Sequence, residues 1–159
     1  MRRGLIALLG ALVLVTGVAL ATPVPVLTLS DGTNEFVGPL DDHAAMRYSY
    51  RQSIYDVPVW EEFERDGDRI ELLRVRSKDI RSIEYFRWDK AIVQDADGWW
   101  RSDAPPSDIS ELVIRIAPLG QQQITTASWS CDMLARLGET VVRVRVDRRP
   151  LVLTLFGTG

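Results

Sequence analysis

Hydrophobic and polar residues alternate along most of this chain, which is the pattern of strands with one buried face. The clearest alternating runs cover residues 46–50, 112–116 and 142–146. Turn signals separate the runs, and two of them, at 66–67 and 97–98, are Asp-Gly pairs typical of tight hairpins. We therefore predict an all-β fold, a β-sandwich or partly open β-barrel of about eight or nine short antiparallel strands, with one N-terminal hydrophobic helix.

One carboxylate interrupts an otherwise apolar strand face. A two-residue turn at 66–67 would pair Phe63 with Ile70. In that register Glu61 lies on the same face, with Arg74 as its diagonal neighbour. A carboxylate in such a place must be paired, protonated or lining a pocket. We favour an ion pair of Glu61 with Arg74 or a neighbouring arginine, and the alternative is a ligand-binding or acid–base group inside the sheet.

The N-terminal segment, residues 1–21, has the features of an export signal. Two arginines at positions 2 and 3 precede an uncharged apolar run over 4–21, which ends in an Ala-Leu-Ala sequence. A positive start, an apolar stretch and small residues at the end are typical of a signal peptide, here with cleavage after Ala21. The alternative is an uncleaved membrane anchor, because the run is about as long as the ~17–25 residues that span a bilayer.

Both interpretations carry the rest of the chain out of the cytoplasm, with the N-terminus inside if the segment is retained. We predict a linker and first strand over 22–45, and a β-rich extracytoplasmic domain over 46–159. The predicted location is the cell membrane with the domain outside, or a secreted or periplasmic protein after cleavage.

Composition removes several classes of function. The chain has 159 residues with 19 Lys and Arg against 22 Asp and Glu, a balance that argues against binding of nucleic acid. A single histidine, His43, and a single cysteine, Cys131, exclude a multi-histidine metal site and an internal disulfide. The sequence has no Gly-rich phosphate loop and no G-x-S-x-G elbow. We therefore predict no cofactor, no metal and no catalytic residue.

Two adjacent tryptophans follow the second Asp-Gly turn. Trp99 and Trp100 would lie on opposite faces of one strand, so we expect one of the rings to be exposed. An exposed tryptophan beside a membrane anchor suits contact with the lipid interface or with a partner protein. This pair is the candidate exposed aromatic contact.

The segment from Tyr50 to Glu61 resembles a signature of the domain-of-unknown-function family 1850. In that family an aromatic-rich strand leads into a His-Ser pair and then into a segment that contains Val-x-Glu. Ser53, Val59 and Glu61 match this pattern, whereas Gln52 stands where the histidine is usual. The resemblance covers about residues 25–148, and later segments follow in the family's order at 81–86, 97–100, 134–138 and 141–146.

The resemblance implies a small, extracytoplasmic, membrane-tethered protein whose relatives are encoded beside, or fused to, permeases of TAXI-type TRAP transporters. It implies a TRAP transporter permease or solute-binding protein as partner, besides the cytoplasmic membrane through residues 4–21. It carries over no catalytic residue, and Gln52 in place of histidine argues against histidine chemistry there. The candidate ligand or partner site comprises Gln52, Ser53, Glu61, Arg74, Glu84 and Tyr85.

Three functions follow from these observations. The first is a non-catalytic accessory protein of a TRAP-type uptake system. The second is a small extracytoplasmic hydrolase that uses Glu61 and Glu84, which would require the two carboxyls to lie about 5–9.5 Å apart across a cleft. The third is a structural module of the cell envelope, with Trp99 or Trp100 at the lipid interface.

Overall fold

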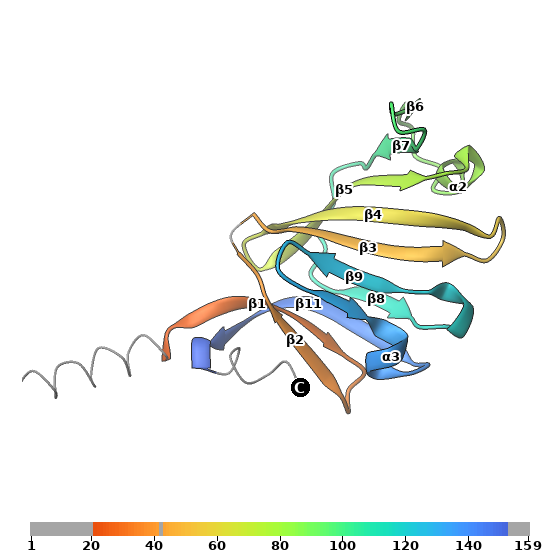
Figure 1. Ribbon diagram of the computed structural model, residues 1–159. Helices are drawn as coiled ribbons and strands as arrows, with labels where there is room; N and C mark the ends of the chain where they lie inside the picture. The colour runs from red at the N-terminus through yellow and green to blue at the C-terminus, as the bar shows by residue number, and fades with distance from the viewer. Residues whose placement is uncertain (1–20, 42, 153–159) are drawn as a thin grey trace, which may run out of the picture.

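Two antiparallel sheets pack face to face in the computed structural model, which describes residues 21–41 and 43–152 (Figure 1). The smaller sheet has the strand order β2 (Glu35–Pro39), β1 (Pro23–Ser30), β11 (Val141–Pro150) and β8 (Leu112–Arg115). The larger sheet has the order β10 (Ser130–Asp132), β9 (Gln123–Thr126), β3 (Ala45–Gln52), β4 (Val57–Asp66), β5 (Arg69–Ser77), β7 (Trp100–Asp103) and β6 (Ile92–Gln94). Three short helical segments connect strands: α2 (Ile80–Glu84), η1 (Pro118–Gly120) and α3 (Met133–Leu137).

The all-β prediction is confirmed, and the open sheet edges make the architecture a sandwich rather than a closed barrel. The described residues form eleven strands, more than the eight or nine that the pattern indicates. The strands that were not predicted include β2 and β10. Both are short, and turn residues in and around them interrupt the alternation of hydrophobic and polar positions. The predicted export segment lies outside the described residues, and within them no helix is long and apolar enough to cross a membrane.

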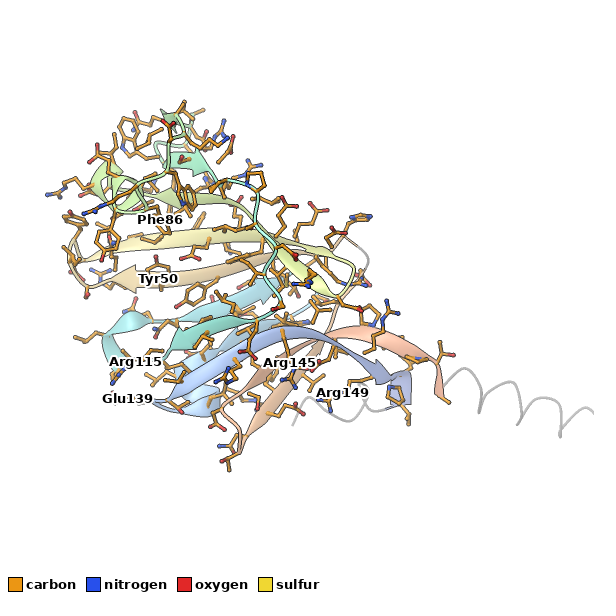
Figure 2. All side chains as sticks on the ribbon, turned by 180° about the vertical axis from the view of Figure 1, so that it is seen from behind. Tyr50, Phe86, Arg115, Glu139, Arg145 and Arg149 are labelled. Carbon is orange, nitrogen blue, oxygen red and sulfur yellow. The ribbon has the colours of Figure 1, made fainter. Side chains whose placement is uncertain are left out.

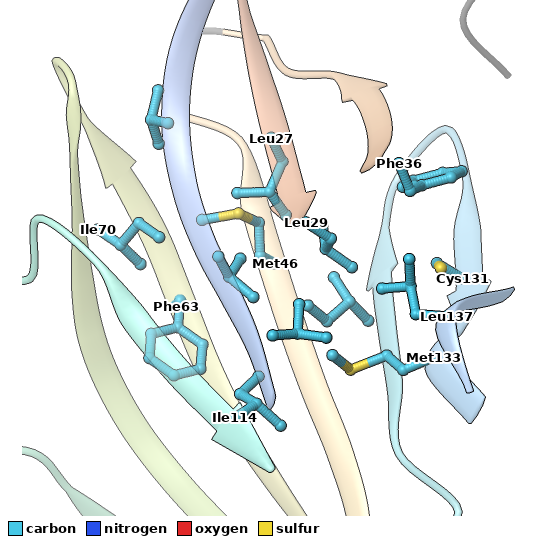
Figure 3. Packing of buried hydrophobic residues seen from close by; sticks show 14 of the residues in the cluster. Leu27, Leu29, Phe36, Met46, Phe63, Ile70, Ile114, Cys131, Met133 and Leu137 are labelled. Atoms are coloured by element: carbon cyan, nitrogen blue, oxygen red, sulfur yellow. The ribbon is translucent and has the colours of Figure 1, made fainter. Parts of the chain in front are cut away.

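The main hydrophobic core lies between the two sheets (Figure 3). Leu27 and Leu29 of β1 meet Met46 of β3, Phe63 of β4 and Ile114 of β8 in this layer. Each of these side chains is buried, and full burial of such a residue contributes about 1.5–3 kcal/mol. The alternating pattern of β3, β8 and β11 therefore marks the strands that close this core.

A second, smaller core joins α2 to the larger sheet. Val59 of β4 and Val75 of β5 pack against Ile83 of α2, and all three are almost fully buried. Asp79 caps the N-terminus of α2, and its carboxylate accepts a hydrogen bond from the backbone N–H of Arg81 at 2.9 Å. A helix of five residues cannot persist alone, so this contact and cap hold it in place.

The register predicted for the β4–β5 hairpin is wrong. Phe63 pairs with Leu72 rather than Ile70, because the turn residues are Gly67 and Asp68. Gly67 has φ +60°, so the glycine occupies the first central turn position, as in a type II′ turn. A β-bulge between Glu62 and Phe63 then shifts the register of the rest of the hairpin by one residue.

The bulge changes which side chains share a face. Beyond it Glu61 pairs with Val75, and Glu62 pairs with Arg74. Arg74 therefore lies on the outer face, where its guanidinium is 3.6 Å from the Glu62 carboxylate. The predicted ion pair of Glu61 with Arg74 does not form, because one inserted residue moves the arginine to the opposite side of the sheet.

Candidate functional site

An apolar pocket of about 630 Å³ opens at one end of the sandwich. Three segments that are distant in the sequence form it: residues 50–54 at the end of β3, Tyr85 and Phe86 after α2, and residues 117–122 around η1. Tyr50, Phe86 and Arg115 lie together at this end of the molecule, whereas Arg149 lies toward the start of β1 (Figure 2). The pocket therefore lies at the end of the sandwich opposite Pro23.

Exposed hydrophobic side chains surround the mouth of the pocket. The exposed fractions are 61% for Ile54, 60% for Tyr85 and 84% for Leu119. Each of these three comes from a different one of the segments that form the pocket. Isolated exposed hydrophobic residues need no explanation, but three that converge on one cavity mark a binding surface.

The amide groups of Gln52 and Gln122 in the pocket wall form hydrogen bonds within the protein. The amide oxygen of Gln52 accepts a hydrogen bond from the Ser82 hydroxyl at 2.5 Å. The side chain of Gln122 donates to the carbonyl of Arg115 at 2.7 Å and accepts from the N–H of Ala117 at 3.1 Å. These bonds hold α2 and η1 against the sheet, so the pocket is formed before any ligand arrives.

Glycine is required at position 120 for this packing. A Cβ atom on Gly120 would lie 2.4 Å from the amide oxygen of Gln122, which is buried and held by two hydrogen bonds. The next residue, Gln121, has φ +47° and turns the chain into β9. The Pro118–Gly120 turn thus brings Leu119 to the pocket mouth. The side-chain amide of Gln122 supports the pocket wall beside this turn.

Glu61 lies behind the pocket wall rather than in it. Its carboxylate accepts a hydrogen bond from the hydroxyl of Tyr50, a residue that lines the pocket. Burial raises the pKa of Glu61 to about 7, and the bond from Tyr50 offsets only part of this effect. Tyr48 stacks on Tyr50 at 5.1 Å, and burial raises the pKa of both tyrosines above the ordinary value. A proton-binding group therefore lies one hydrogen bond from the cavity.

The structure brings together some of the residues predicted for the site. Gln52, Ser53 and Tyr85 line one pocket, and Glu61 reaches it through Tyr50. Glu84 is exposed at the end of α2 and does not line the pocket. Arg74 is excluded, since it lies on the outer face of the sheet with Glu62.

The tryptophan prediction needs correction. Trp99 is only 8% exposed because its ring stacks on Trp60, with 3.9 Å between the ring centroids. Trp100 is half-buried and packs on the second core. Cations cover the stacked pair from both sides, with Arg47 4.4 Å from the ring of Trp60 and Lys78 4.8 Å from that of Trp99. Trp99 is therefore not an exposed contact, and Trp100 is exposed only in part.

Several residues of the pocket escaped the sequence-based prediction. Phe86 could have been predicted, because it directly follows Tyr85 in the sequence and the two form an aromatic pair. Leu119 stands in a Pro-Leu-Gly turn, and only the structure shows that its side chain is exposed. Gln122 carried no signal, because only the fold reveals that its amide is buried.

The chemistry available at this pocket is binding through apolar contact. No carboxylate lines the pocket wall, so Glu61 and Glu84 do not face each other across it. Within residues 21–41 and 43–152, no group of three or more histidine, cysteine or acidic side chains could hold a metal ion. Comparison with protein-family models, curated proteins and solved structures finds no match to this chain. The resemblance to family 1850 therefore stays a prediction.

Proposed function

We propose that this protein is an exported, membrane-tethered β-sandwich that binds without catalysis and assists a TRAP-type solute transporter. The observation that carries the proposal is the preformed apolar pocket with its exposed rim of Ile54, Tyr85 and Leu119. A rigid pocket with an apolar wall is a typical binding site. The resemblance to family 1850 supplies the transporter as the partner.

The position of the pocket supports a tethered role. Val24 at the start of β1 pairs with Arg149 near the end of β11, and the pocket is at the other end of the sandwich (Figures 1 and 2). Strand β1 has eight residues and spans roughly 26 Å. If residues 1–21 anchor the chain, the pocket faces away from the bilayer, toward the solute, a solute-binding protein or the outer face of a permease.

The alternatives have less support. A hydrolase that uses Glu61 and Glu84 would need both carboxyls in one cleft, and neither lines this pocket. An envelope module held at the lipid interface by Trp99 or Trp100 would need an exposed ring, whereas Trp99 is buried against Trp60 and Trp100 is half-buried against the second core.

Affinity purification from detergent-solubilised native membranes tests the proposal. The full chain carries a C-terminal tag, and mass spectrometry identifies what is recovered with it. We expect TRAP transporter subunits, together with a chain that retains residues 1–21. The matched control replaces residues 1–21 with a cleavable leader, and it should recover fewer subunits if tethering contributes. Recovery of a lone chain from both samples would overturn the proposal.

A further inference from the structure

We infer that the pocket takes an uncharged small molecule with an aromatic ring, which enters between Tyr85, Phe86 and Leu119. This inference rests on the proposed binding function, and it names the class of ligand for the same site. The inferred ligand is a small molecule rather than a protein. The volume of the pocket, the charges of its lining residues and the aromatic rings in its wall each support this inference.

Size favours a small molecule over a protein partner. Twelve residues line the pocket, and its volume is about 630 Å³. This volume lies within the ~300–1,000 Å³ of small-molecule sites. A stable protein interface uses about 20–30 residues on each side, many more than this rim provides. The concave shape thus holds one compact group and offers little surface beyond it.

Charge favours an uncharged ligand. Only one lining side chain is charged, Arg51, and its guanidinium is paired with the Asp56 carboxylate. The amides of Gln52 and Gln122 already bond to Ser82 and to the backbone. A charged ligand would lose its hydration without gaining a counter-charge, which is costly in an apolar site.

The rings in the wall favour an aromatic ligand. Tyr50, Tyr85 and Phe86 come from two of the three segments and all line the pocket. Tyr50 and Phe86 are held by neighbouring rings, Tyr48 at 5.1 Å and Trp88 at 5.0 Å, so their positions are fixed before binding. Tyr85 is largely exposed and leaves a ring face free. An entering ring can make offset or edge contacts with these rings, which add to the gain from burial.

Photolabelling of the full chain in native membranes tests the inference. The probe is a neutral phenyl(trifluoromethyl)diazirine, which on illumination loses dinitrogen and inserts as a carbene into nearby bonds. Mass spectrometry then maps the labelled peptides. We expect labelling at Tyr85, Phe86 and Leu119 that saturates with probe concentration. The carboxylate analogue of the probe, with the same ring, should label these peptides about tenfold less, because its charge must stay outside.

Two matched variants complete the test. Leu119→Asp places a charge at the pocket mouth and should lower labelling of Tyr85 and Phe86 about tenfold. Val113→Asp changes a residue that is 55% exposed on β8, away from the pocket, and should leave labelling unchanged. Equal labelling by the two probes, or no effect of Leu119→Asp, would overturn the inference.

The result also separates this inference from the proposed function. If transporter subunits co-purify but the neutral probe leaves the pocket unlabelled, the ligand class is wrong and the accessory function stands. If Leu119→Asp also abolishes co-purification in that case, the pocket docks a protein. Saturable labelling without transporter subunits would support the ligand class and reject the TRAP role.

Discussion

At the scale of single residues, the most informative group is the half-buried Glu61 carboxylate. Its pKa of about 7 in the folded protein lies above its ordinary value of 4.5. A raised pKa means that the folded state favours the protonated form of Glu61. The contribution of this protonated carboxyl to the free energy of unfolding is complete below pH 4.5 and is lost as the pH rises through 7. Above that pH the protein holds a buried charge with Tyr50 as a hydrogen-bond donor.

Glu61→Gln should therefore stabilise the protein at high pH and change little at low pH. Relative to the unsubstituted chain, we expect a gain of about 3 kcal/mol at pH 8.5 and little gain near pH 4.5. Urea unfolding followed by tryptophan fluorescence at the two pH values measures the difference. Glu62→Gln is the matched control, since Glu62 lies on the outer face beside Arg74 and its substitution should change the free energy of unfolding by less than about 1 kcal/mol. A gain for Glu61→Gln that is the same at both pH values would contradict this account.

At the scale of elements, the pocket depends on how α2 is held. Ile83 anchors this short helix in the second core, and Ser82 bonds to Gln52 at the end of β3. Both partners of that hydrogen bond are buried. Removal of the hydroxyl would leave the Gln52 amide oxygen without this donor, which costs free energy because the residue is buried.

Ser82→Ala should lower the free energy of unfolding by about 1–3 kcal/mol and loosen the wall that carries Tyr85 and Phe86. Unfolding measures the first effect and photolabelling measures the second, as weaker saturation at the two rings. Ser53→Ala is the control, because Ser53 is exposed in the β3–β4 turn and should have no effect on stability. A Ser82→Ala protein with unchanged stability and labelling would mean that α2 is held by apolar contact alone.

The same scale explains which parts of the fold the sequence predicts. The alternation over residues 46–50 of β3 extends to Gln52, which is buried like Met46 because a strand has a fixed period of two. The bulge after Glu62 leaves no trace in the pattern, since one extra residue in a strand needs no special residue type. The sequence therefore could not predict that Arg74 pairs with Glu62, although it correctly placed Glu61 on the same face as Phe63. The sequence did not predict the pocket for a different reason. The three segments that form it are distant in the sequence and come together only in the folded chain.

At the scale of the whole molecule, β1 is the strand on which the smaller sheet depends. It lies between β2 and β11, and Leu27 is 1% exposed in the middle of the core. Leu27→Ala should cost about 2–5 kcal/mol, because close-packed neighbours cannot fill the cavity. Val113→Ala, on the exposed side of β8, should change stability by no more than about 0.5 kcal/mol. Thermal unfolding of the two variants measures the contrast, and equal melting temperatures would show that β1 is not central to stability.

The antiparallel pairing of β1 with β11 has a mechanical consequence. The start of β1 and the end of β11 lie side by side at one end of the sandwich, with Pro23 opposite Pro150. The pocket opens at the opposite end of the sandwich. A force between an N-terminal tether and a load at the pocket would pull β1 along its own axis. The hydrogen bonds to β2 and β11 lie across that axis, so they would share the load in shear. A force applied between the two chain ends would instead separate β1 from β11 by breaking their hydrogen bonds one after another, starting at Pro23 and Pro150. If the chain is tethered and binds a ligand at the pocket, as proposed, the pairing of β1 resists a pull on that ligand better than a pull between the two chain ends.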